Sequence, residues 1–343
     1  MSRRTLSPAL ALALACGLLL AGCGGEDPAG SPARAPVGAP SARGESMAPT
    51  ADSPFWVDPD SDAARQVRQY EAQGRTEEAE LLRRIAERPV AEWPAGDDPV
   101  PDVTRAVRGA AVDRRTVVFV AYNIPHRDCG MYSAGGARDA GAYREWIGAF
   151  ADAIGEAKAI VVLEPDAVPH IVDGCTPGQY HGERYQLLSE AVDRLKRQPN
   201  TRVYLDAGNP AWIDDPGKLV EPLRKAGVAE ADGFSLNVSN FQTDDTVKSF
   251  GARLSGMLGG AHFTVDTSRN GVGPLAGDRE EAWCNPPGRA LGVPPTDRTG
   301  DALVDAYLWI KRPGESDGPC RGGPAAGTWW PEYALGLARR AEG

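Results

Sequence analysis

The sequence contains few of the residues on which metal-dependent enzymes rely. Only four histidines occur among its 343 residues. They are His126, His170, His181 and His262, and no His-Glu-x-x-His pattern places two of them on one helix face. We therefore interpret them as surface or internally hydrogen-bonded residues, and we predict no metal and no other cofactor.

Basic residues are also in deficit. Lysine and arginine number 37 against 47 aspartate and glutamate residues, which gives a formal net charge of −10. Because phosphate backbones attract basic surfaces, this balance argues against nucleic acid as a partner. The acidic excess otherwise fits a secreted protein.

No apolar run reaches the roughly 20 residues of a transmembrane helix. Arg3 and Arg4 precede an apolar run over residues 8–21, which is typical of an export signal. The run ends in Leu-Leu-Leu-Ala-Gly-Cys and resembles the lipobox of bacterial lipoproteins, with Cys23 as the lipid-modified residue. A plain secretory signal is the alternative. Both interpretations predict an exported protein. A lipoprotein signal would anchor it by lipid to the outer face of the cell membrane, and a plain signal would leave it secreted.

Three segments follow from this pattern. Residues 1–22 form the predicted signal peptide. Residues 23–53 are rich in Gly, Pro, Ala and Ser and nearly lack large apolar residues, which predicts a disordered tether. Residues 54–343 show no second linker and no repeat, so we expect one folded domain there.

Cysteine usage agrees with export. Of six cysteines, Cys16 leaves with the signal and Cys23 takes the lipid. The remaining four are Cys129, Cys175, Cys284 and Cys320. An even number in an oxidising compartment predicts two disulfides, with three possible pairings. Four buried free thiols are the alternative.

Strand-like runs alternate with helical patterns along the domain. The runs cover residues 55–58, 116–123, 159–166, 202–209, 233–240, 262–270 and 304–311. Between them, apolar residues recur with helical spacing, as Tyr143, Trp146, Phe150 and Ile154 do, and again Leu188, Val192 and Leu195. Alternating strands and helices predict an α/β fold with a parallel sheet, closed as a (β/α) barrel. An open doubly wound sheet is the alternative, but no Gly-rich phosphate loop follows the first strand.

Polar side chains stand where these strands end. They are Asp58, Tyr122, Asn123, Glu164, Asp166, Asp206, Asn237, Asp266 and Lys311. In parallel α/β folds the loops after the strands converge on one face, where active sites lie. Turn chemistry alone accounts for polar residues at two or three strand ends but not at the ends of all seven strands.

Further acids and aromatic residues accompany these strand ends, namely Asp128, Glu315, Asp317, Trp212, Trp283 and Trp309. This mixture suits sugars, whose hydroxyls bond to carboxylates and whose C–H faces stack on rings, and paired carboxylates cleave glycosidic bonds.

Seven motifs in order resemble glycoside hydrolase family six, the inverting cellulases, over roughly residues 55–340. They are VVFVAYNIPHRDCGMYSAGGA, VVLEPDAV, RVYLDAGNPAW, GFSLNVSN, FTVDTSRNGVGP, AWCNPPGRALG and DAYLWIKRPGESDGPC. The resemblance implies a distorted barrel of about seven parallel strands with its active site at their carboxyl ends. It also implies hydrolysis of β-1,4-glucan with inversion at the anomeric carbon.

The resemblance further implies residue roles. Asp166 corresponds to the general acid, and Asp128 to a residue that keeps this acid protonated and relays a proton. Asp317 corresponds to the candidate base, while Tyr122 and Asp206 match further active-site positions. We expect Glu164 to be a structural partner rather than the acid.

Substrate contacts are implied for a larger set: Ser133, Trp212, Asn237, Arg269, Asn270, Trp283, Lys311 and Glu315. Asn209 stands where the family usually has a histidine that contacts substrate. The family's disulfide pairing would join Cys129 to Cys175 and Cys284 to Cys320, bracing the loops that carry Asp128 and Asp317.

Chain-end-acting relatives carry a long loop after the position of Asp317 that roofs the site. This segment is short here, so we expect an open cleft and endoglucanase action on β-1,4-glucan or cello-oligosaccharides by a monomer. The alternatives are a cellobiohydrolase, another β-glucan hydrolase, and a surface lipoprotein that binds glycan without cleaving it. Contact with a membrane is expected only through the N-terminal lipid.

Overall fold

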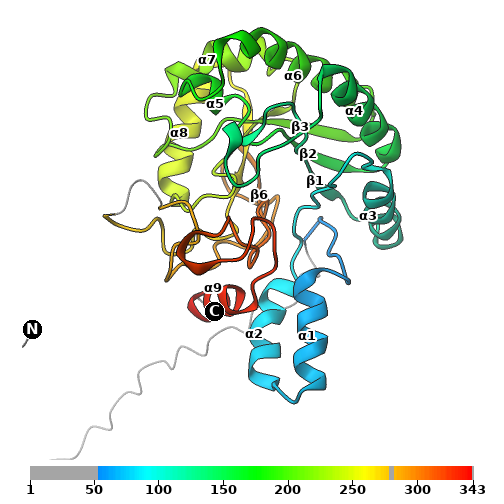
Figure 1. Ribbon diagram of the computed structural model, residues 1–343, viewed down its shortest axis with the longest axis vertical. Coiled ribbons are helices and arrows are strands. Elements are labelled where there is room, and N and C mark those ends of the chain that lie inside the picture. Colours follow the sequence, from blue (N-terminus) through cyan, green and yellow to red (C-terminus); the bar gives the residue numbers. More distant parts are fainter. Residues whose placement is uncertain (1–52, 278–281, 342–343) are drawn as a thin grey trace, which may run out of the picture. The chain divides into compact units, whose positions relative to one another are not determined.

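A parallel sheet forms the centre of the computed structural model, which describes residues 53–277 and 282–341. Its six strands lie side by side in chain order (Figure 1). They are β1 (Val117–Ala121), β2 (Ala159–Leu163), β3 (Thr201–Asp206), β4 (Gly233–Leu236), β5 (His262–Asp266) and β6 (Val304–Leu308). Every residue of β1, β2 and β4 is buried. Strands covered on both faces require the near-continuous apolar runs that the sequence shows.

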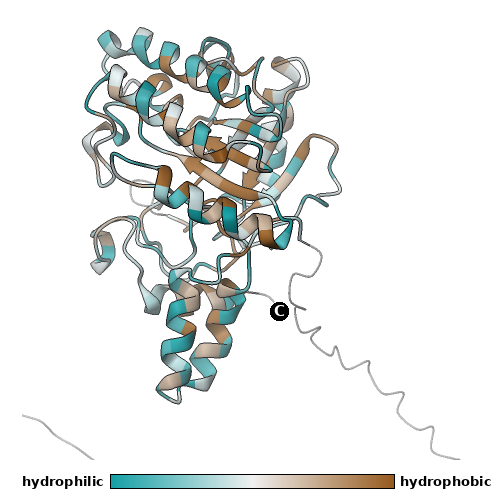
Figure 2. Ribbon diagram, turned by 90° about the vertical axis from the view of Figure 1, so that its right-hand side faces the viewer, coloured by the Kyte–Doolittle hydropathy of each residue, from teal (hydrophilic) through white to brown (hydrophobic). Residues whose placement is uncertain are grey.

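Helices cover the outside of this sheet. They are α3 (Val100–Asp113), α4 (Ala140–Ile154), α6 (His181–Leu195), α7 (Gly217–Lys225) and α8 (Asp244–Met257), with the short α5 (Pro169–Val172) inside the loop after β2. The apolar residues predicted to face the core from α4 and α6 are all buried there. Figure 2 shows apolar strands inside and helices that expose polar residues. The predicted α/β architecture is confirmed.

The first predicted strand, at residues 55–58, is wrong. Only Phe55 pairs, through one isolated bridge to Thr116. Pro54 and Pro59 flank this run, and because proline has no N–H to donate, it limits strand pairing. The described sheet therefore has six strands instead of about seven.

A short segment, residues 91–93, spans the gap between the two edge strands. The Ala91 N–H donates to the carbonyl of Trp309, just after β6 (2.9 Å), and Glu92 exchanges hydrogen bonds with Val118 and Val120 of β1, both 2.8 Å. Ala91 packs with the residues that point inward from the strands. This segment therefore occupies the place at the sheet edge that was predicted for residues 55–58, and it is too short to show a strand pattern.

Three helices build a second apolar cluster beside the barrel. They are α1 (Asp62–Ala72), α2 (Thr76–Ala86) and α9 (Pro331–Arg340) (Figure 1). Leu82, Ile85, Leu335 and Leu337 are buried among them. Trp309 joins this cluster, which connects the helices to the strand edge. Three single 3₁₀ turns complete the elements: η1 (Asp128–Gly130), η2 (Gly178–Tyr180) and η3 (Cys320–Gly322).

The predicted signal peptide, the predicted lipidation site Cys23 and the predicted tether lie outside the described residues, except for Ser53. Within residues 53–277 and 282–341, no helix has the length and apolar character needed to cross a membrane.

Candidate active site

Ionisable side chains from the loops after β1 and β2 and from the end of β3 meet at the carboxyl ends of these strands. Asp128 belongs to the loop after β1, Asp166 follows β2, and His170 lies in α5; one polar atom from each lies within 4.8 Å of the others. Asp206 ends β3, and its Oδ2 accepts a hydrogen bond from the Asp166 backbone N–H at 2.8 Å. We call Asp128, Asp166, His170 and Asp206 the acid group.

The chain around Asp166 takes an unusual backbone conformation. Glu164 and Asp166 both have positive φ angles, 50° and 70°, which non-glycine residues adopt only when their surroundings compensate. The Glu164 carboxylate supplies part of that compensation, because it accepts hydrogen bonds from the backbone N–H groups of Asn123 (3.0 Å) and Ile124 (2.9 Å). Burial raises the pKa of Glu164 to about 7. Glu164 thus joins the loops after β1 and β2, which fits the structural role expected for it.

The carboxyl group of Asp166 stays protonated more readily than an ordinary aspartic acid. Burial raises its pKa well above the usual value, and the negative charges of Asp206 and Asp128 raise it further. Asp206 is fully buried, and burial raises its own pKa to about 7. The Asp166 residue nevertheless remains partly exposed. The raised pKa favours the protonated form of a residue that is partly exposed.

Asp128 is held by its own loop. The Ser133 N–H donates to its Oδ2 at 2.5 Å, and burial raises the pKa of Asp128. The disulfide between Cys129 and Cys175 ties this loop to the segment after α5. This pairing is the one that the family resemblance implied.

Tyr122 lies beside the acid group. Burial raises the pKa of its hydroxyl, as do the charges of Asp166 and Asp128, so the phenol remains a hydrogen-bond donor. Its ring and that of Trp93 pack edge to face with their centres 5.7 Å apart, and the Arg127 guanidinium lies 4.6 Å from the centre of the Tyr122 ring. The Trp93 indole N–H donates to the Ile310 carbonyl at 2.8 Å, which fixes the ring at the strand edge.

A second group of charges lies on the loops after β5 and β6. Arg269 and Asp317 form a buried ion pair, with Nη1 and Oδ2 2.8 Å apart. The same Oδ2 accepts from the Asn285 N–H at 3.0 Å, and Lys311 Nζ lies 3.9 Å from Oδ1. Lys311 also lies 3.8 Å from Glu315 Oε2. We call Arg269, Lys311, Glu315 and Asp317 the ion-pair group, and the Cys284–Cys320 disulfide closes the loops around it.

Two residues of the intervening loops act inside the fold. The Asn237 amide group donates to the Asp266 carbonyl at 2.9 Å, and Asn270 donates to Asp244 Oδ1 at 2.7 Å. The Asp266 carboxylate accepts from the backbone N–H groups of Ser239, Ser268 and Lys311, each at 2.9 Å. These contacts anchor the loops after β4 and β5, and sugar contacts by Asn237 and Asn270 stay predictions.

Asn209 caps the turn after β3 through its side chain. Its Oδ1 accepts from the N–H groups of Ala211 (3.0 Å) and Trp212 (3.2 Å). Asn209, which the resemblance places where the family usually has a histidine, therefore caps the turn that follows β3, and Trp212 is held at the end of this turn.

The loops that carry Asp128 and Asp317 touch across the site. Tyr132 is 46% exposed and its ring centre lies 6.0 Å from that of Trp283. A Cβ atom built on Gly318 would come within 2.4 Å of the Tyr132 ring. Tyr132 therefore packs directly over the residue that follows Asp317.

Two sequence features prove to be structural. Trp309, which we placed at the sugar site, is 2% exposed and donates to the Val293 carbonyl at 3.0 Å, so that prediction is wrong. Residues 314–318 have the Gly-x-Ser-x-Gly spacing of a serine nucleophile turn, but Ser316 is buried and its Oγ bonds to the carbonyls of Gly318 (2.9 Å) and Pro324 (2.8 Å).

The comparisons with known proteins agree with this geometry. The sequence pattern of glycosyl hydrolases family 6 matches residues 50–341. The chain belongs to glycosyl hydrolase family 6. It is 41% identical to Endoglucanase A of Cellulomonas fimi over 299 residues, which are 85% of this chain and 62% of that protein. It is 41% identical to Endoglucanase 1 of Streptomyces halstedii over 291 residues, covering 82% of this chain and 87% of that one.

A solved family 6 structure has the same fold. The endoglucanase Cel6 from Mycobacterium tuberculosis, in complex with methyl-cellobiosyl-4-deoxy-4-thio-β-D-cellobioside, is 43% identical. It superimposes with a TM-score of 0.77 over 85% of this chain and 98% of its own. The chain thus spans nearly all of that structure but under two thirds of the C. fimi protein.

Two residues beside the family 6 site, His170 and Trp93, were not predicted from the sequence. His170 was interpreted as a surface or satisfied histidine, but it lies in the acid group, with Nδ1 3.4 Å from Asp173 Oδ2. The same Oδ2 accepts from the Trp212 indole N–H at 2.9 Å, and the His170 and Trp212 rings meet at 4.8 Å. Trp93 was likewise unassigned. A single histidine and a single tryptophan were the only signals, and they were too weak to separate these residues from core residues.

Proposed function

We propose that this protein hydrolyses internal β-1,4-glucosidic bonds of cellulose or soluble β-glucan with inversion of the anomeric configuration. The observation that carries the proposal is the partly exposed Asp166, whose pKa is raised by burial and by Asp206 and Asp128. An ordinary aspartic acid, with a pKa of about 3.9, would be ionised near neutral pH and could not donate a proton. Membership in family 6 supports the same reaction.

Asp166 acts as the general acid. Its proton passes to the glycosidic oxygen as the bond between this oxygen and the anomeric carbon breaks, and the leaving sugar departs as an alcohol. A water molecule attacks the anomeric carbon from the opposite face and gives up a proton to a carboxylate. Inverting enzymes keep acid and base about 6.5–9.5 Å apart to admit this water.

Two carboxylates are candidates for receiving that proton. Asp317 forms a buried ion pair with the Arg269 guanidinium, with Oδ2 and Nη1 2.8 Å apart, which supports a role as base. Asp128 lies within 4.8 Å of Asp166 and keeps that acid protonated, and it could pass a proton from the water. We assign Asp317 as the base and Asp128 as the tuning and relay residue, with Tyr122 and Asp206 completing the site.

Sugar binding is assigned to the aromatic and charged side chains around these acids. Trp212 and Trp283 are partly exposed and offer faces for the C–H side of a glucosyl ring. Lys311 and Glu315 provide a donor and an acceptor for hydroxyl groups, and Ser133 lies beside Asp128. The substrate is a β-1,4-glucan or a cello-oligosaccharide.

Endo action is favoured by two findings. Only a short segment separates Asp317 from Trp329, and relatives of 41% identity are named endoglucanases. An open cleft would accept an internal stretch of a polymer, whereas a roofed site would require a chain end.

The proposal includes export and a lipid anchor at Cys23, supported by the N-terminal sequence. The enzyme would act as a monomer outside the cell and would touch the membrane only through that lipid. A Cys23→Ser variant should be recovered from the medium instead of the membrane fraction. Recovery of the unchanged protein from the medium without lipid would favour the plain secretory signal.

The catalytic proposal is tested with carboxymethylcellulose and cello-oligosaccharides. The wild-type protein should lower viscosity quickly relative to the reducing ends that it releases, and NMR should detect the inverted anomer first. Asp166→Asn should remove nearly all activity, while Asp214→Asn, at an exposed position, should not. A folded wild-type protein that is inactive on a panel of β-glucans would overturn the proposal.

A further inference from the structure

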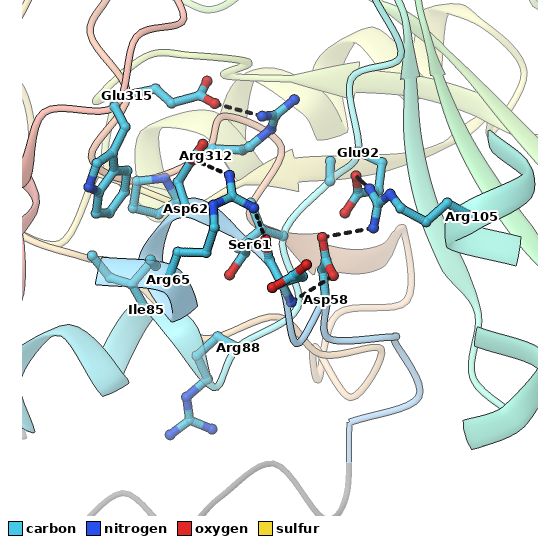
Figure 3. Close-up of a pocket in the computed structure, with 16 residues that line it drawn as sticks. Asp58, Ser61, Asp62, Arg65, Ile85, Arg88, Glu92, Arg105, Arg312 and Glu315 are labelled. Atoms are coloured by element: carbon cyan, nitrogen blue, oxygen red, sulfur yellow. Dashed lines mark hydrogen bonds and ion pairs between the residues drawn. The ribbon is translucent and has the colours of Figure 1, made fainter. Parts of the chain in front are cut away.

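A polar cavity of about 210 Å³ lies beside the ion-pair group (Figure 3). Its walls come from the start of α1, the segment that spans the edge strands, α3 and the loop after β6. Asp58, Glu92, Arg105, Arg312, Glu315 and Trp329 line it, together with Asp62 and neighbouring residues. Sites for drug-sized ligands usually measure about 300–1,000 Å³, so this cavity suits a single sugar ring.

Glu315 is a wall that the cavity shares with the candidate active site. Its Oε1 accepts from Arg312 Nη1 at 2.7 Å on the cavity side. Its Oε2 lies 3.8 Å from Lys311 Nζ, which in turn lies 3.9 Å from Asp317 Oδ1. Glu315 therefore links the lining of the cavity to Lys311 and Asp317 through these contacts.

The lining offers both donors and acceptors without a dominant charge. Arg105 bridges Asp58 (2.9 Å) and Glu92 (2.7 Å) on one side, and Arg312 pairs with Glu315 on the other, as Figure 3 shows. Near balance of acids and arginines disfavours a strongly charged ligand, because neither sign is in excess. A neutral molecule rich in hydroxyl groups matches such a surface.

One buried donor of this lining lacks a partner. Among the residues that the structure describes, Arg312 Nε has no hydrogen-bond acceptor although it is buried. Buried polar atoms are nearly always paired, and an exception calls for a ligand or a water. The Trp329 indole is partly exposed at the same cavity and offers an apolar face beside these polar groups.

We propose that this cavity binds one additional glucosyl residue of the substrate, next to the sugar held by Lys311 and Glu315. The proposal rests on the β-glucan hydrolysis proposed above and extends the cleft at that end. A chain that is cut internally has to continue beyond the central sugars, and the cavity would give that continuation specific contacts.

The test compares substrates of different length. For the wild-type enzyme, kcat/KM should rise from cellotetraose to cellohexaose. Asp62→Trp places a bulky ring in the cavity from the partly exposed first residue of α1, and Glu92→Gln removes a charge without changing shape. Each variant should reduce the ratio of kcat/KM for cellohexaose to kcat/KM for cellotetraose by about tenfold. This is the effect expected when a substrate loses one or two hydrogen bonds to charged groups. Reducing-end-labelled cellohexaose should also be cut at a different bond.

The ratio separates this role from a general loss of folding, which would lower both values alike. Glu190→Gln, which breaks an exposed ion pair with Arg144 on the helical surface, is the matched control and should leave the ratio unchanged. An active enzyme whose ratio stays the same in Asp62→Trp would overturn the additional subsite while the proposed function stands. A wild-type protein inactive on every β-glucan would instead overturn the proposed function.

Discussion

The carboxyl groups of Asp128 and Asp166 lie within 4.8 Å of each other, on loops that follow two neighbouring strands. Two negative charges at this distance repel each other strongly, so one group retains its proton. Burial favours Asp166 as that group. The parallel pairing of β1 with β2 brings the two loops together. The protonation of Asp166 therefore depends on the order of the strands in the sheet.

Asp128→Asn should shift the alkaline limb of the pH–activity profile. Asp166 has to be protonated to act, so its pKa sets the pH above which activity falls. Removing the Asp128 charge lowers that pKa, and the limb in kcat/KM should move down by about one pH unit or more. Asp214→Asn, at an exposed position, is the control. An unmoved limb in Asp128→Asn would show that Asp128 does not tune the acid.

The stability of the fold should decrease between about pH 4 and pH 7. Glu164 and Asp206 have pKa values of about 7 in the folded protein, above their ordinary values near 4 in the unfolded chain. Within this window the folded state holds protons that the unfolded chain has released, so unfolding becomes easier as the pH rises. Thermal unfolding across this range should show the decrease, and Asp206→Asn should flatten it. A curve of equal slope in the variant would contradict this assignment.

The sequence predicted the strands that carry long apolar runs, because burial on both faces leaves a pattern that no surface segment imitates. It failed at residues 91–93, where three residues pair with two edges and no periodicity can develop. Residues 55–58 failed in the opposite way, since an apolar run between prolines imitates a strand without being able to pair as one.

The acids of the site were predictable because burying a carboxylate at the end of a strand costs free energy, which a protein rarely accepts without a functional reason. His170 and Trp93 were not, because a single histidine or tryptophan has the same appearance in a core as in a site. Trp309 illustrates the reverse error, because it was assigned to the sugar site but is a buried core residue. The two disulfide pairings came from the family resemblance, since the cysteine count alone allowed three pairings.

Replacing Arg269 should destabilise the protein through Asp317. Both side chains are buried, at 0% and 5% exposure. Removing one partner of a buried ion pair costs about 3–5 kcal/mol, and Lys311 Nζ, 3.9 Å from Asp317 Oδ1, is too far to replace the hydrogen bond from Arg269. Arg269→Met should therefore lower the unfolding free energy by an amount of this order. The double variant with Asp317→Asn should lose clearly less than the sum of the two single changes, which a double-mutant cycle measures. Additive losses would show that the pair is not energetically coupled.

Gly318→Ala should disturb the contact with Tyr132. The added Cβ would lie 2.4 Å from the Tyr132 ring, and Gly318 has a φ of 150° that alanine rarely adopts. We expect a loss of about 1–3 kcal/mol and reduced activity, because the loops that carry Asp128 and Asp317 would separate. Gly322→Ala is a matched control, since Gly322 has a φ of 78° with open space around it. Equal activity losses in both variants would assign the effect to backbone strain alone.

Removal of the Cys284–Cys320 disulfide should affect catalysis as well as stability. This bond joins the loop of Trp283 to the loop after Asp317, and Asn285, next to Cys284, donates its N–H to Asp317 at 3.0 Å. The serine double variant should lose about 2–4 kcal/mol of stability, and kcat should fall because the carboxylate is no longer fixed. The serine double variant of Cys129 and Cys175 should lose comparable stability. Because this disulfide holds the loop that carries Asp128, the variant should show a shifted alkaline limb of the pH–activity profile and not a lower kcat. Activity and pH profiles of both variants, taken below their unfolding temperatures, separate the two effects. If both variants lost stability with unchanged kcat and unchanged limbs, the disulfides would act on the fold and not on the position of the acids.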